Sequence, residues 1–193
     1  MHRIIAAAII LALAGCGHVP VTSLPKLSKL DIMTLDVKQL RVAVDMPNGL
    51  RVRENGAVIA VGLREAAGGP AREERVVLED VTNTERGPIS DPSPQARIFR
   101  IPQHDVARLE ALRETIRQRK AAYPDDTKGY LTVTSAACRT AQLPDGPLRV
   151  NTWLKTSADE PYFILTRQVD IRSLVPRRDL ALELPSCTDR GAG

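Results

Sequence analysis

Alternation of apolar and polar residues, interrupted by short turn signals, constrains the fold of this chain more than any other feature. It is clearest in residues 40–46, where every second residue is large and apolar. A period of two places these side chains on one face of a half-buried β-strand. The next residues, Pro47-Asn48-Gly49, predict a tight turn, because Asn-Gly is the strongest short turn signal.

Similar segments recur along the rest of the chain. We expect strands at residues 57–63, 74–82, 95–101, 130–135, 147–156 and 162–168, with short strand pieces at 169–174 and 179–184. The segments 147–156 and 162–168 predict a hairpin, since only a short polar turn separates them. About eight short strands predict a mainly β domain, an antiparallel sandwich that is Ig-like or a partly open barrel. The alternative architecture is a curved sheet wrapped on a helix.

Residues 102–123 are the exception, and they predict one amphipathic helix inserted between strands. Proline is favoured in a first turn, and Pro124 ends the element. At about 100° per residue, one stripe of this helix is apolar. The stripe consists of Leu109, Leu112, Ile116 and Tyr123. We expect it to pack on a face or an edge of the sheets.

Basic residues border this stripe, among them Arg113, Arg117 and Lys120. Two interpretations are open. Such a border is typical of helices that lie on a membrane, and it would make these three residues an interaction surface. The same pattern arises when a helix packs on its own sheet and its long basic side chains reach outward to water. The narrow stripe favours packing on the sheet.

The beginning of the chain indicates a compartment. A short, positively charged start precedes 11 consecutive apolar residues at positions 4–14. This run is too short to cross a bilayer stably and is typical of a secretory signal. It ends in Leu13-Ala14-Gly15-Cys16. Here the sequence resembles the signal peptide of bacterial lipoproteins, whose lipobox reads leucine, two small residues and cysteine.

The resemblance implies cleavage before Cys16, so that residues 1–15 are removed and Cys16 carries acyl chains that bind the membrane. Two or more such chains hold a protein stably on a bilayer. In enterobacterial members of the family, aspartate after the cysteine retains the protein in the inner membrane. Gly17 stands at that position here, which implies the periplasmic face of the outer membrane. The alternative is an ordinary secretory signal with a cysteine near the cleavage site by chance.

The remainder of the chain then divides into three parts. Residues 16–30 contain Pro20 and Pro25 and predict an extended tether. Residues 31–187 are expected to form a single β-rich domain. Residues 188–193 are small and polar, and they predict a frayed tail.

Two cysteines remain after lipidation, Cys138 and Cys187. An oxidising periplasm favours a disulfide between them, which would tie the C-terminal strand to the sheet. The alternative is two separately buried thiols. Neither cysteine belongs to a C-x-x-C motif, so a redox or zinc role is not expected.

The sequence offers little for catalysis. It contains no G-x-S-x-G nucleophile elbow, H-E-x-x-H zinc motif, calcium loop or P-loop. His104 beside Asp105 is expected to be solvated at the start of the helix, and adjacent acids such as Glu79 and Asp80 are expected to face water. We therefore predict no catalytic residues, no metal ligands and no cofactor.

Charge and compartment together favour one class of function. The net charge of +4 is small and spread along the chain, which argues against a nucleic-acid binder. We expect a structural or interaction module of the cell envelope that binds a protein partner. The alternative is a carrier that shields a lipid or another apolar ligand, and an apolar cavity between the sheets would favour it. An enzyme is the least favoured class.

Overall fold

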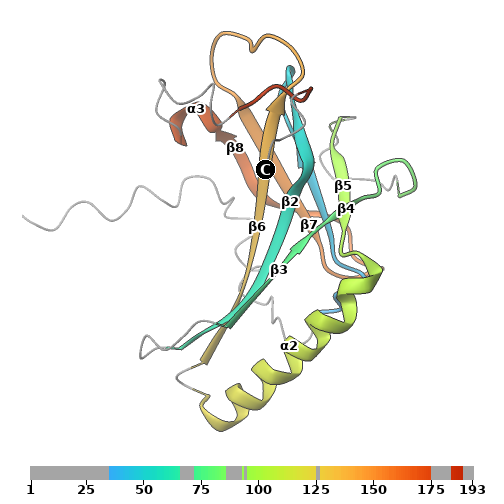
Figure 1. The fold of residues 1–193 in the computed structure, drawn as a ribbon, viewed down its shortest axis with the longest axis vertical. Coiled ribbons are helices and arrows are strands. Elements are labelled where there is room, and N and C mark those ends of the chain that lie inside the picture. The colour runs from blue at the N-terminus through green and yellow to red at the C-terminus, as the bar shows by residue number, and fades with distance from the viewer. Residues whose placement is uncertain are drawn as a thin grey trace, which may run out of the picture.

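The chain folds into two antiparallel sheets that face each other as in a β-sandwich (Figure 1). The structure is a computed structural model, and it describes residues 35–65, 72–85, 93, 95–124, 127–174 and 184–188. The mainly β fold predicted from the sequence is confirmed. The predicted signal peptide and tether lie outside the described residues, as does the predicted tail beyond Thr188.

The larger sheet has five strands in the order β4-β5-β1-β7-β8. Its strands are β1 (Arg41–Asp45), β4 (Glu79–Asp80), β5 (Arg97–Arg100), β7 (Arg149–Lys155) and β8 (Phe163–Asp170). β1 is the central strand, and Ala43 lies opposite Ile98 of β5 on one side and Trp153 of β7 on the other. β7 and β8 pair with each other, which confirms the predicted hairpin.

The smaller sheet has three strands in the order β3-β2-β6. They are β2 (Leu50–Glu65), β3 (Arg72–Val77) and β6 (Thr127–Arg139). Both β2 and β6 are longer than the sequence predicted. β2 begins earlier than predicted because the turn at residues 47–49 leads directly into it. Gly49 adopts a φ of 85° there, and the Leu50 N–H donates to the Pro47 carbonyl at 3.1 Å.

Two other predictions about strands are wrong. Residues 74–82 form not one strand but the end of β3 and then β4, because the chain changes sheets at the buried residue Leu78. The predicted strand at 169–174 ends at Asp170, and α3 (Ile171–Leu174) follows. Asp170 explains this change, since its carboxylate accepts the Arg172 N–H at 3.0 Å, as a helix cap does. Residues 179–183 lie outside the described part of the chain.

The predicted helix is confirmed as α2 (Gln103–Ala122), between β5 and β6. It lies along the lower part of the three-stranded sheet in Figure 1, on the side that faces the core. Leu109, Leu112 and Ile116 are buried as expected, and Val106 joins them. Tyr123 does not, because the helix ends before it and its side chain is 54% exposed. None of the helices in the described ranges is long and apolar enough to cross a membrane.

Side chains from both sheets and from α2 meet in one contiguous core. Val42 and Val44 enter it from β1, and Ile59 and Val61 enter it from β2. A second, smaller cluster lies on the opposite face of the five-stranded sheet. It consists of Ala43, Val81, Ile98, Trp153, Tyr162 and Ile164. β1 is therefore buried on both faces, although the alternation in its sequence predicted a strand with only one buried face.

Candidate functional site

The predicted disulfide between Cys138 and Cys187 is confirmed. Their Cα atoms lie 4.9 Å apart, within the limit of about 7 Å that a disulfide allows. Cys138 is buried near the end of β6, and Cys187 comes from the C-terminal segment 184–188. The bond closes a long covalent loop, since the two residues are 49 positions apart.

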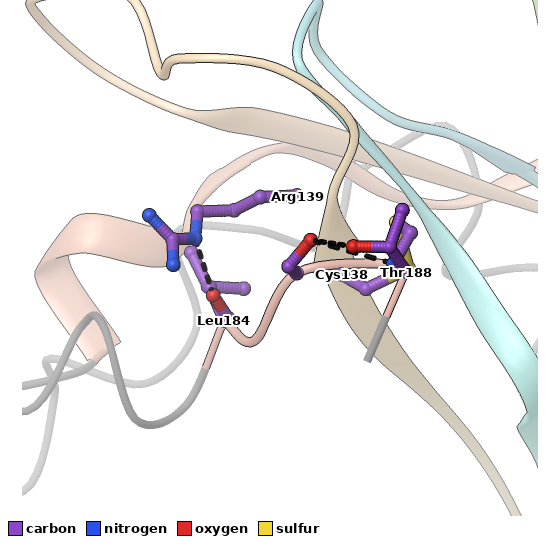
Figure 2. The surroundings of a disulfide bond; sticks show 6 residues. Cys138, Arg139, Leu184 and Thr188 are labelled. Carbon is purple, nitrogen blue, oxygen red and sulfur yellow. Dashed lines mark hydrogen bonds between the residues drawn. A yellow bond between two sulfur atoms is a disulfide. The ribbon is translucent and has the colours of Figure 1, made fainter. Parts of the chain in front are cut away.

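The C-terminal segment also pairs with β6 through its backbone. The Arg139 N–H donates to the Pro185 carbonyl at 2.8 Å, and the Cys187 N–H donates to the Arg139 carbonyl at 2.9 Å. The Arg139 guanidinium donates from Nε to the Leu184 carbonyl at 2.7 Å, as Figure 2 shows. These bonds and the disulfide hold the segment against the sheet edge.

The structure separates the three basic residues of the predicted helix surface. The Arg113 side chain is only 9% exposed, and its Nη1 donates to Glu110 at 2.8 Å. Arg117 and Lys120 are exposed, and Arg117 forms an ion pair with Glu114 one turn earlier. Arg113 thus does not share an open surface with the other two residues. A role for Arg117 and Lys120 in binding stays a prediction.

His104 is exposed to solvent at the start of the helix, as its sequence context predicted. Its side chain is 83% exposed at the start of α2, and Nε2 lies 3.4 Å from the Asp105 carboxylate. Within the described ranges, no group of three or more potential metal ligands comes together.

A pocket that the sequence analysis did not predict lies at the edge between the two sheets. Its volume is about 440 Å³. One wall is the first half of β2, and the other is formed by the crossing from β3 to β4 and by β5. The lining residues are Arg51, Val52, Arg53, Glu54, Asn55, Gly56, Ala57, Leu78, Glu79, Asp80, Arg97 and Phe99.

A large bulge in β2 shapes the first wall. Val52 pairs with Ala137 and Ala57 pairs with Ser135, so four residues of β2 (53–56) stand opposite one residue of β6. Asn55 adopts a φ of 55°, a conformation that asparagine tolerates better than most residues. Bulges of this kind often lie beside functional sites.

Gly56 is required at the bulge because no side chain fits there. A Cβ atom on Gly56 would lie 2.8 Å from the carbonyl oxygens of both Arg53 and Ala136. The Asn55-Gly56 dipeptide was the available sequence signal, since Asn-Gly marks a sharp change of direction. The close approach of the backbone therefore restricts position 56 to glycine.

Ion pairs neutralise the acids of the second wall. Arg97 donates from Nε to Asp80 at 2.7 Å, and Arg100 donates from Nε to Glu79 at 3.0 Å. Partial burial acts to raise the pKa of Asp80, but hydrogen bonds from Thr82 and Arg97 outweigh it and lower that pKa. By contrast, Arg51 and Arg53 are exposed and form no ion pair within the part of the chain described here.

A second charged cluster lies at the edge of the outer face of the five-stranded sheet. Glu85 accepts from Arg41 Nη2 at 3.1 Å and lies 3.6 Å from Arg100 Nη1. The hydrogen bond from Arg41 outweighs partial burial and, with the charges of Arg41, Arg100 and Lys155, lowers the pKa of Glu85. Nearby, burial raises the pKa of Tyr162 to about 12. The cluster links β1, β5 and the turn that follows β4.

This cluster predicts an acid-sensitive contribution to stability. Because the folded pKa of Glu85 lies below its ordinary value of 4.5, its contribution is complete above that pH and is lost as the pH falls through the folded pKa. Glu85→Gln should lower the free energy of unfolding at pH 7 by about 1 kcal/mol. Urea unfolding between about pH 7 and pH 3 measures this loss of stability, and the variant should lose less stability on acidification than the wild type.

Asp159→Asn, in an exposed turn, is the control for this prediction. Equal acid slopes in wild type and Glu85→Gln would contradict the assignment.

Comparison of the chain with protein-family models, with curated proteins and with solved structures found no match.

Proposed function

We propose that this chain is a lipid-anchored protein of the bacterial cell envelope that acts as a structural or interaction module. The lipobox Leu13-Ala14-Gly15-Cys16, directly after a short apolar run, is the observation that carries the proposal. Acyl chains on Cys16 would hold the domain on the membrane. Gly17 after the cysteine favours the periplasmic face of the outer membrane, by the enterobacterial rule.

The Cys138–Cys187 disulfide supports an envelope location independently of the signal. Disulfides persist in oxidising compartments such as the periplasm, and they are rare in the bacterial cytosol. A secreted protein would form this bond after export, when the C-terminal segment has docked on β6.

The packing of the sandwich favours a binding module over a carrier. A carrier of a lipid needs an apolar cavity large enough for its ligand. Here the facing sides of the sheets and α2 meet in one cluster of buried side chains. The pocket at the sheet edge has six charged residues among its twelve lining residues, which suits a polar partner better than a lipid chain.

Metabolic labelling with an alkyne fatty acid tests the anchor. The wild-type chain, expressed in a bacterial host, should take up the label and sediment with the membranes, because Cys16 is acylated. Cys16→Ser should lose both properties. Cys187→Ser is the matched control and should keep the label, since it lies outside the lipobox. Equal labelling of wild type and Cys16→Ser would refute the proposal.

A further inference from the structure

We propose that the pocket beside the β2 bulge binds an extended acidic segment of a partner protein, with Arg51 and Arg53 as the anchoring cations. This inference rests on the proposed function as an interaction module and names the kind of partner. Three features of the pocket support it: its position, its two arginines that form no ion pair among the described residues, and its apolar floor.

The pocket lies where one edge of β2 has no neighbouring strand among the described residues. β3 pairs with β2 only at residues 58–63 of β2, and the Leu78 N–H donates to the Ala57 carbonyl at 2.8 Å where this pairing ends. The chain then crosses to the other sheet as β4. Arg51 and Val52 therefore pair with β6 on one side, and no described strand pairs with residues 51–56 on the other side, where we place the ligand.

The charges of the pocket are suited to an anionic ligand. The carboxylates of Asp80 and Glu79 are engaged by Arg97 and Arg100 of the same protein. Arg51 and Arg53 are not engaged in this way within the described residues, and Glu54 is the one other carboxylate that lines the pocket. Guanidinium groups bind carboxylates through two parallel hydrogen bonds, which gives both strength and orientation.

The floor of the pocket adds a requirement for apolar side chains. Val52, Ala57, Leu78 and Phe99 line it, and each of these residues is at most 8% exposed. A volume of about 440 Å³ holds a few side chains rather than a whole domain. The ligand that fits both features is a short segment in which acidic residues alternate with apolar ones.

Amide NMR of the full-length, ¹⁵N-labelled chain in detergent micelles tests the site. The probe is a five-residue peptide of alternating Glu and Leu with blocked ends, which carries three carboxylates. Its addition should shift the amides of residues 51–57 and 78–80. The matched peptide with Gln in place of Glu should bind at least about tenfold more weakly, since it lacks the charges that arginine recognises.

Variants of the protein locate the binding residues. Arg51→Gln combined with Arg53→Gln should weaken binding of the Glu peptide at least about tenfold, and the melting temperature should stay unchanged because both residues are exposed. Arg117→Gln on α2 is the control and should bind like the wild type. Loss of binding in Arg117→Gln, with binding intact in the double variant, would place the site on the helix and overturn the proposal.

Three further results would also overturn it. They are equal binding of the Glu and Gln peptides, inorganic phosphate shifting the same amides with the same affinity, and binding to phosphatidylglycerol vesicles in preference to the peptide. Fatty-acid labelling of the same preparations separates this proposal from the proposed function. A labelled chain that binds no peptide refutes the pocket alone, whereas an unlabelled chain that binds the peptide refutes the anchor alone.

Discussion

Replacing Ile116 with aspartate should unfold the domain or lower its free energy of unfolding by at least about 4 kcal/mol. Ile116 is fully buried between α2 and the core-facing side of the three-stranded sheet. A carboxylate at that position would be buried without a partner, and the packing of the isoleucine would be lost as well. Thermal and urea unfolding of the purified protein measure the effect.

The end of the same helix provides the control for this prediction. Tyr123→Asp also introduces a carboxylate, but Tyr123 is 54% exposed, so its stability should stay within about 0.5 kcal/mol of the wild type. If Ile116→Asp also melted within a degree or two of the wild type, the helix would not be packed inward. Residues 103–122 would then have to be regarded as a surface for a membrane or a partner.

Removing the disulfide should have an effect of similar size. Cys187→Ala should lower the free energy of unfolding by about 4 kcal/mol, the value that chain entropy gives for a separation of 49 residues. The backbone bonds between Arg139 and the C-terminal segment should weaken too, because nothing covalent then holds that segment on β6.

Reduction provides the matched measurement for the disulfide. A reducing agent should destabilise the wild type by a comparable amount and leave Cys187→Ala unchanged, since that variant has no bond to break. A Cys187→Ala variant within about 0.5 kcal/mol of the wild type would show that the bond contributes little to stability.

Most of the fold could be predicted from the sequence where strands are bordered by turns. β1 alternates regularly, and β5, β7 and β8 are short apolar segments bordered by turn residues, which is enough to predict each strand. The first half of β2 could not be predicted, because residues 53–56 are polar or small and break the alternation. The strand continues through them only because β6 pairs with it on both sides of the bulge.

The change of sheets at Leu78 has a similar explanation. Val76, Val77 and Leu78 form an apolar run that predicts one strand. In the structure Val77 is 43% exposed, and the residues that follow Leu78 pair with β5. That pairing depends on a strand about 20 residues further along the chain, so no local pattern contains it.

The candidate pocket was missed for the same physical reason. Its lining comes from three separate segments, residues 51–57, 78–80 and 97–99, and none of them carries a known binding motif. The burial of Arg113 also depends on tertiary neighbours. A helical period placed it only at the border of the apolar stripe, where either outcome was possible.

The intact mass of the protein, isolated from bacterial membranes without reducing agent, tests the central claim of a lipid-anchored, disulfide-closed envelope module most directly. We predict the mass of residues 16–193 plus acyl groups, less two hydrogens for the Cys138–Cys187 bond. Fragmentation should locate the acyl groups on Cys16. An unmodified chain of 193 residues, or a processed chain with no acyl group and two free thiols, would contradict the account.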